Sequence, residues 1–126
     1  MGTLTLEPLG TDFAIARLDA DAPVPGWAEG PGFVSVTRTQ GELSVMCAAD
    51  RVPAPVTAER GWTGYRFAGT FDFGQTGVAA AALAPLGEAG VPVLMIATFD
   101  TDYLLVKAAD QGRAEAALRA AGHRIA

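Results

Sequence analysis

Strand-like and helix-like patterns of apolar positions alternate most clearly in the second half of the chain. Apolar side chains at 78, 82, 83 and 86 have helical spacing, whereas the run after them is almost continuously apolar. The pattern predicts a strand, a helix, two strands, a helix and a short strand at Trp62–Gly69, Val78–Ala89, Val91–Phe99, Tyr103–Lys107, Gln111–Ala121 and His123–Ala126. This β-α-β-β-α-β order is that of the ferredoxin-like fold, an antiparallel sheet with two helices on one face.

Local signals add detail to these elements. The apolar run Val91–Phe99 is typical of a central strand that is covered on much of both faces. Pro85 removes one hydrogen bond from the first helix, the bond to the carbonyl of Ala81. Asp110 is expected to cap the second helix. The side chains of that helix expected to face inward are Ala114, Ala117, Leu118 and Ala121.

The first half of the chain is less regular and richer in turn residues. Its pattern predicts strands at Leu4–Leu6, Phe13–Leu18, Phe33–Thr39 and Glu42–Ala48. Residues 8–12 are expected to form a turn, and Gln40-Gly41 is expected to join the last two strands as a hairpin. The Pro- and Gly-rich segment 22–32 is expected to be loop, with one helical turn at Trp27. The boundary between the halves is expected around Thr57–Gly61.

Composition excludes several classes of protein. Half of the 126 residues are hydrophobic, so the chain can bury a core and is not disordered. Nine basic residues are scattered among fourteen acidic ones, so no nucleic-acid partner is expected. The longest apolar stretch, Val78–Leu86, is far shorter than the ~20 residues of a membrane span. The first nine residues lack the features of a signal peptide. We therefore expect a cytoplasmic protein with no membrane partner.

The side chains that usually carry chemistry are few. Cys47 lies in an apolar run and is expected to be a small buried hydrophobe. His123 is the one histidine and is expected to be a solvated cation at a helix end. Asp100 and Asp102 are spaced like metal ligands but have no evident third ligand. No catalytic triad or nucleotide-binding motif is present. The sequence therefore predicts no catalytic residues, metal or cofactor, and a protein that is not an enzyme.

One segment carries a family resemblance. Thr98-Phe99-Asp100-Thr101-Asp102-Tyr103 and the apolar strand that ends at Lys107 resemble the second and third strands of ACT domains of the CASTOR and aspartate-kinase-like group. Gly61-Trp62, Phe71-Asp72-Phe73 and Leu86–Val91 are similar to the rest of that domain. In the first half, the parts that resemble the degenerate ACT-like half of small bacterial proteins of this type are Trp27, Thr37–Thr39 and Glu42–Val45.

The resemblance implies both a fold and a function. The fold is α+β, with two tandem ferredoxin-like modules whose antiparallel sheets carry helices on one face. A degenerate ACT-like module is expected at residues 1–60 and an ACT domain at residues 61–126. The implied function is regulatory, non-catalytic binding of an amino acid or similar small ligand at the interface between the modules or at a dimer interface. A homodimer is also expected, because the Ala- and Gly-rich helix faces and the free sheet edges offer self-complementary surfaces.

The same resemblance implies ligand contacts in four places. The glycine-rich loop before the first helix can meet a carboxylate with its backbone N–H groups. Asp102 can hold the α-ammonium group or a basic side chain of the ligand. Thr98 and Phe99 offer backbone groups at a strand end, and Ser44 and Val45 would face the ligand across a groove between the modules. The loop residues assigned to the site are Asp72, Gly74, Gln75, Thr76 and Gly77.

Each of these residues also has a plainer interpretation. The loop is then an ordinary turn with Thr76 as helix N-cap, and Asp102 is a hairpin residue. Arginine sensors carry an acidic residue where Gln75 and Thr76 are neutral, so a neutral amino acid, or no ligand, stays open. The alternative function is a protein–protein interaction module with a vestigial ligand groove.

Overall fold

The computed structural model describes residues 2–72 and 74–126, and Phe73 of the glycine-rich loop lies outside them. The chain divides into two compact units. Unit 1 contains the residues up to Gly10 together with Thr63–Ala126, and unit 2 contains Thr11–Trp62. No helix within the described ranges is long and apolar enough to span a membrane.

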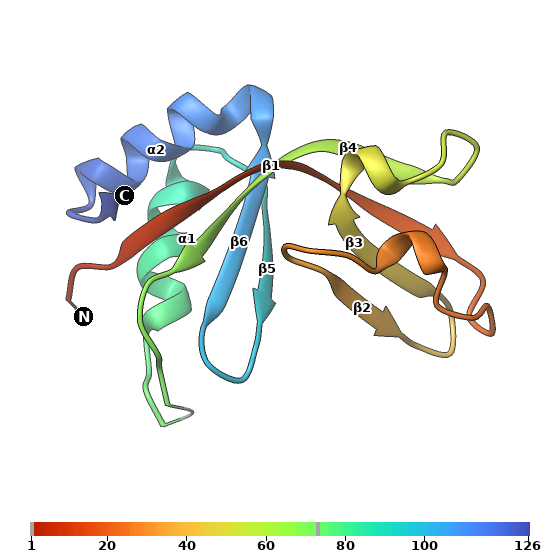
Figure 1. Cartoon of the computed structure of the whole chain (residues 1–126). Coiled ribbons are helices and arrows are strands. Elements are labelled where there is room, and N and C mark those ends of the chain that lie inside the picture. Colours follow the sequence, from red (N-terminus) through yellow and green to blue (C-terminus); the bar gives the residue numbers. More distant parts are fainter. Residues whose placement is uncertain (1, 73) are drawn as a thin grey trace. The chain divides into compact units, whose positions relative to one another are not determined.

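The predicted α+β fold class is confirmed (Figure 1). The strand order in the sheet is β2-β3-β1-β4-β6-β5, and β7 pairs with β1. The strands are β1 (Thr5–Leu18), β2 (Ser35–Arg38), β3 (Leu43–Ala48), β4 (Ala58–Phe67), β5 (Val93–Ala97), β6 (Asp102–Lys107) and β7 (Arg124–Ile125). The helices are α1 (Val78–Glu88) and α2 (Gln111–Ala120), with 3₁₀ turns η1 (Gly26–Ala28), η2 (Ala49–Arg51) and η3 (Ala108–Asp110).

Unit 1 contains the second part of β4, from Thr63, followed by α1, β5, β6, α2 and β7 in the predicted order. Both helices bury small apolar faces in one hydrophobic cluster with the strands, so they pack on the same face of the sheet (Figure 1). The helix residues of this cluster are Val78, Ala82, Leu86, Ala114 and Leu118, and its strand residues include Leu6, Tyr65, Phe67, Leu104 and Val106. Ala121, expected to face inward, is exposed because α2 ends at Ala120.

Strand β1 is continuous, so the predicted turn at residues 8–12 is wrong. Gly10 adopts a φ of +72°, which distorts the extended backbone at this residue, but the chain does not reverse its direction there. The first part of β1 pairs in parallel with β7, Thr5 opposite Arg124 and Leu6 opposite Ile125. Ala68 also donates a backbone hydrogen bond of 2.8 Å to Thr5. Residues up to Gly10 therefore belong to unit 1, which differs from the division expected at residue 60.

Strand β5 lies at the end of the strand order, so the prediction of a central strand over Val91–Phe99 is wrong. The residues Val93–Ile96 are only half-buried. Its neighbour β6 is an interior strand between β4 and β5, and Leu104, Leu105 and Val106 of β6 are fully buried. An apolar run shows that both faces of a strand avoid water, but it does not show whether a neighbouring strand lies on each side.

Helix α1 contains Pro85, which has no N–H to donate to the carbonyl of Ala81. The ring of His123 supplies the missing partner, with Nε2 at 2.8 Å from that carbonyl oxygen. Nδ1 of the same ring accepts a hydrogen bond of 3.0 Å from the backbone N–H of Leu4. Because Nδ1 accepts, the ring is the neutral tautomer with its proton on Nε2. The expectation of a solvated, charged His123 is therefore wrong, and its side chain is buried.

Helix α2 begins after Asp110, as predicted, but the carboxylate does not cap it. Oδ1 of Asp110 instead accepts a 2.8 Å hydrogen bond from Arg113. The helix is joined to β4 by the hydroxyl of Tyr65, which donates a 2.6 Å hydrogen bond to Glu115 Oε2. Burial, and then the bond to Glu115, raise the pKa of Tyr65.

Unit 2 contains the second part of β1 with β3 and β2, paired antiparallel. The predicted hairpin is confirmed, and Oγ1 of Thr39 accepts hydrogen bonds of 3.1 Å from the N–H groups of Gly41 and Glu42 at its turn. Cys47 is fully buried in the core of the unit, and this burial raises the pKa of its thiol. The described part of the unit has 3₁₀ turns in place of α-helices, one of them at Trp27 as expected.

Candidate functional site

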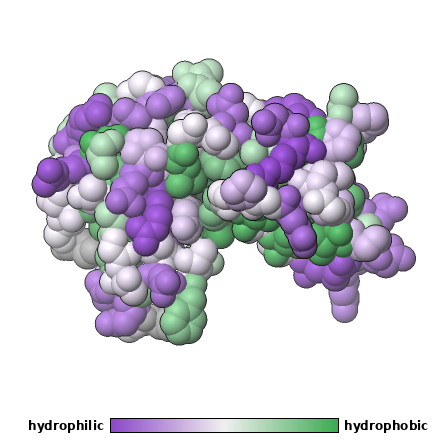
Figure 2. All heavy atoms as spheres, viewed as in Figure 1, coloured by the Kyte–Doolittle hydropathy of each residue, from purple (hydrophilic) through white to green (hydrophobic). Residues whose placement is uncertain are grey.

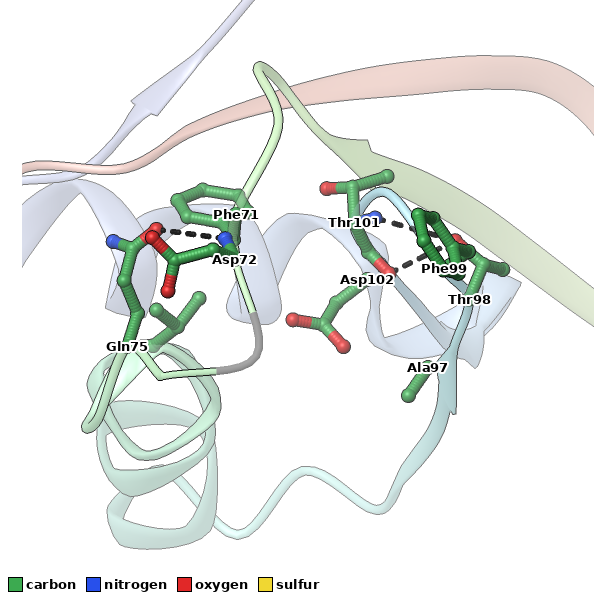
Figure 3. Close-up of a pocket in the computed structure, with 9 residues that line it drawn as sticks. Phe71, Asp72, Gln75, Ala97, Thr98, Phe99, Thr101 and Asp102 are labelled. Carbon is green, nitrogen blue, oxygen red and sulfur yellow. Dashed lines mark hydrogen bonds between the residues drawn. The ribbon is translucent and has the colours of Figure 1, made fainter.

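A small pocket of about 170 Å³ opens in unit 1 between two loops at one end of the sheet (Figure 3). The segment between β4 and α1 forms one side, and the β5–β6 hairpin forms the other. The lining residues are Phe71, Asp72, Gln75, Val78, Ala97, Thr98, Phe99, Thr101 and Asp102. The two loops are joined by a backbone hydrogen bond of 2.8 Å from Phe71 N–H to the carbonyl of Asp100.

The hairpin side of the pocket is held by Thr98 and Thr101. Thr98 donates to the carbonyl of Thr101 from its backbone N–H and from its hydroxyl, each at 2.9 Å. Thr101 is buried, and its hydroxyl donates a 2.8 Å hydrogen bond to the carbonyl of Phe67 in β4. These bonds fix the turn from both ends, so the position of the next residue, Asp102, is defined by the sheet and not by a free loop.

The loop side of the pocket is organised by Asp72 and Gln75. Asp72 Oδ1 accepts a 2.9 Å hydrogen bond from Gly74 N–H, and Gln75 Oε1 accepts one of 3.2 Å from Asp72 N–H. The side chain of Asp72 is thus used to shape the turn. The loop ends at Gly77, which is the N-cap of α1 with a φ of +79° and no side-chain capping bond. Thr76 is therefore not the N-cap.

Of the two carboxylates that line this pocket, that of Asp102 has fewer hydrogen-bond and ion-pair partners than that of Asp72. Its side chain is partly buried, and among residues 2–72 and 74–126 it has no ion-pair or hydrogen-bond partner for its oxygens. Figure 3 shows this carboxylate pointing from the hairpin into the space toward Gln75 and Asp72. The lining residues include no lysine or arginine. The pocket therefore offers negative charge on one side and the start of α1 on another.

A second hollow of about 360 Å³ adjoins the pocket and shares Phe71, Asp72, Gln75 and Phe99 with it. Thr70 and Asp100 complete its lining. The side chain of Phe99 is 80% exposed, although it is a large hydrophobe. On the face of the molecule seen in Figure 2, hydrophilic and hydrophobic residues both reach the surface.

The structure brings together five of the ten predicted site residues: Asp72, Gln75, Thr98, Phe99 and Asp102. Gly74, Thr76 and Gly77 lie in the same loop without lining the pocket. Val45 is fully buried in the core of unit 2, and Ser44 lines a different groove of about 470 Å³ on that unit. Neither residue lines the pocket of unit 1.

Four lining residues were not predicted: Phe71, Val78, Ala97 and Thr101. For Thr101 a signal exists, because a Thr three residues after another Thr in a tight hairpin forms reciprocal turn bonds. The three apolar residues carry no signal that separates them from core residues. No group of three or more His, Cys, Asp or Glu side chains able to hold a metal ion occurs in the described part of the chain.

Comparison with known families assigns the chain to a class of regulatory domains. The family model described as the ACT domain matches residues 57–120, just over half of the chain. A second model, described as an N-terminal domain, matches residues 11–55. The chain belongs to the ACT domain family. This confirms the resemblance seen in the sequence, and ACT domains are regulatory modules that respond to small ligands and carry no catalysis of their own.

Solved structures agree with this assignment. Protein Atu0741 from Agrobacterium tumefaciens is 39% identical, with a TM-score of 0.95 over 100% of this chain and 94% of that one. Aspartate kinase from Clostridium acetobutylicum, described as an allosteric enzyme, is 12% identical with a TM-score of 0.69, over 96% of this chain and 35% of the kinase. The E. coli aspartokinase III complex with aspartate and ADP is 12% identical with a TM-score of 0.62, over 94% of this chain and 32% of that enzyme. The kinases show likeness of fold alone. No curated protein gives a significant match.

Proposed function

We propose that the chain binds an amino acid, without chemical turnover, in the pocket of unit 1. The observation that carries the proposal is the carboxylate of Asp102, which points into the pocket and has no partner among the described residues. A carboxylate that is partly removed from water gains most from a cationic partner that supplies hydrogen bonds. The ammonium group of an amino acid is such a partner.

The N-terminus of α1 would bind the other end of the ligand, its carboxylate. The first N–H groups of a helix have no partners inside the helix, and Gly77 caps α1 without a side chain. A carboxylate beside Val78 would meet these groups and the positive end of the helix dipole. The ligand side chain would extend into the adjoining hollow between Phe71 and Phe99.

The charge of the lining sets an order of preference among amino acids. Asp72 and Asp102 line the pocket and Asp100 lines the adjoining hollow, with no basic side chain in either set. A ligand with an acidic side chain would be repelled by these carboxylates. We therefore propose a neutral or basic amino acid as the ligand, with aspartate and glutamate as the weakest binders.

The regulatory output would come from a shift between two states of the protein. A ligand shifts such an equilibrium only by the difference between its affinities for the two states. We also propose that the chain works as a homodimer, because small-residue helix faces and free sheet edges offer self-complementary surfaces.

The binding proposal is tested by a thermal-unfolding screen of the wild-type protein with each natural amino acid. A ligand present at a thousandfold excess over its Kd stabilises the folded state by about 4 kcal/mol. We expect stabilisation by one neutral or basic amino acid or a small set of them. A flat response to all of them would contradict the proposal and favour the interaction module.

The site is tested with Asp102→Asn. Loss of one charge-assisted hydrogen bond, about 1.5–3 kcal/mol, weakens binding roughly tenfold to hundredfold. Asp21→Asn is the matched control, because Asp21 is exposed and lines neither hollow. Isothermal titration of the amino acid found in the screen measures both. Equal affinities for the two variants would place the ligand elsewhere.

A further inference from the structure

The two sides of the ligand pocket are joined at the tip of the β5–β6 hairpin. The hydroxyl of Thr101 donates a hydrogen bond of 2.8 Å to the carbonyl of Phe67, the last residue of β4. The carbonyl of the preceding residue, Asp100, accepts a bond of 2.8 Å from the N–H of Phe71. Two adjacent hairpin residues therefore hold the start of the segment that forms the opposite side of the pocket.

Of these two bonds, the one from Thr101 requires a particular side chain. The bond between Phe71 and Asp100 joins backbone groups, which almost any residue supplies. Thr101 is only 4% exposed, and burying a hydroxyl costs free energy unless the hydroxyl is hydrogen-bonded. Valine has nearly the same shape and would be easier to bury at this position. The bond to Phe67 is therefore the advantage that threonine has here.

The anchored threonine directly precedes the carboxylate that the proposed function assigns to the ligand. Asp102 is the first residue of β6, and its side chain points into the pocket (Figure 3). The carbonyl of Thr101 also accepts two bonds of 2.9 Å from Thr98, so the residues of the hairpin tip are held to one another. A displacement of this tip would therefore displace the carboxylate of Asp102 relative to α1.

We propose that Thr101 is a positioning residue, whose bond to β4 holds the carboxylate of Asp102 at the distance from the N-terminus of α1 that an amino acid spans. This inference rests on the proposed function and adds how the site selects its ligand. An α-amino acid binds Asp102 with its ammonium group and α1 with its carboxylate, so it needs both sides in place. An amine without a carboxylate binds Asp102 alone. Loss of the anchor should therefore weaken the binding of amino acids and not that of amines.

Matched pairs of compounds separate these two kinds of binding. L-leucine is compared with isoamylamine, and L-lysine with cadaverine, because each amine is the amino acid without its carboxylate. In Thr101→Val the hairpin is no longer anchored, so the fraction of molecules with the correct spacing falls. The Kd of the amino acids should rise roughly threefold to tenfold, the equivalent of one hydrogen bond, while the Kd of the amines should stay within about twofold. Nuclear magnetic resonance titration measures all four values.

Two variants control for the substitution itself. Thr101→Ser keeps the hydroxyl and should restore the wild-type Kd values to within about twofold. Thr39→Val removes a hydroxyl that holds the β2–β3 turn in unit 2, and because Thr39 lines neither hollow of unit 1, all four Kd values should stay unchanged. Hydrogen exchange adds a measurement without ligand: the amide of Phe71 should exchange roughly threefold to tenfold faster in Thr101→Val than in the wild-type protein.

Three results would overturn the inference, and they can be told apart. Equal weakening of amino acids and amines in Thr101→Val would mean a general loss of structure and not a change of spacing. Unchanged exchange at Phe71 together with unchanged Kd values would exclude the anchor and leave the proposed function intact. A wild-type protein that binds none of the four compounds and no amino acid in the thermal screen would overturn the proposed function, and this inference with it.

Discussion

His123 shows how one side chain compensates for a defect elsewhere in the chain. Pro85 leaves the carbonyl of Ala81 without its helical donor, and Nε2–H of His123 donates to that oxygen at 2.8 Å. The other ring nitrogen accepts from Leu4 at the start of the chain. The imidazole therefore connects the N-terminal segment, helix α1 and the segment after α2, and it does so as a neutral ring.

A double-mutant cycle measures this connection. His123→Ala should lower the free energy of unfolding by about 2–4 kcal/mol, because it leaves a buried donor and a partly buried acceptor without partners. In a Pro85→Ala background the same change should cost about 1 kcal/mol less, since residue 85 then donates to Ala81 itself. Urea unfolding gives both values. Arg124→Ala, at an exposed neighbour, should stay within about 0.5 kcal/mol of the parent, and equal costs in the two backgrounds would contradict the coupling.

The sequence predicted which segments form helices and strands better than it predicted which strands lie next to one another. The two helices and the β5–β6 hairpin follow from apolar spacing and from turn residues such as Gly90 and Asp110. The continuity of β1 through Pro8 and Gly10 did not follow, because the residues that usually form turns also occur within bent strands. Nor did the edge position of β5, because strand order depends on contacts between residues far apart in the sequence.

Replacing the N-cap glycine of α1 and a glycine within the helix by alanine should change the stability of the protein in opposite directions. Gly77 has a φ of +79°, so Gly77→Ala should destabilise the protein by about 1–2 kcal/mol. Gly87 lies within the helix, and a methyl group there would meet no atom within 4 Å. Gly87→Ala should stabilise by about 0.5–1 kcal/mol. Thermal unfolding of the two variants compares them directly, and a shift of the same sign in both would refute this account of the helix ends.

At the scale of the whole molecule, unit 1 is discontinuous in sequence. The matched ACT segment begins at residue 57, yet the unit also needs the residues up to Gly10. Leu4 and Leu6 are buried in its core cluster, and β7 pairs with Thr5 and Leu6. The segment that the family model matches therefore covers only part of unit 1.

A fragment of residues 57–126 should therefore lack a cooperative unfolding transition. It loses two buried leucines, each contributing about 1.5–3 kcal/mol, and the partner strand of β7. Residues 2–10 joined to residues 63–126 by a flexible linker should recover the transition, as followed by circular dichroism. Full stability of the shorter fragment would mean that β1 is dispensable for unit 1.

Some residues of the candidate site could be predicted from the sequence and others could not, and the reasons differ by residue. Asp102 and the loop at Asp72 and Gln75 could be found because the family resemblance placed them. Thr101 could have been found from its turn chemistry, whereas Val78 and Ala97 look like any core residue in a sequence. Val45 was assigned to the site although its strand pattern equally fits a core position, and it is fully buried in unit 2.

The bond between His123 and Ala81 also has an evolutionary consequence. In a relative with a residue other than proline in place of Pro85, the backbone N–H of that residue would donate to the carbonyl at position 81. Selection would then no longer retain histidine at position 123. Substitutions at these two positions, 38 residues apart, should accordingly be inherited together across the family. A large collection of homologous sequences in which proline and histidine come and go independently would argue against this shared history.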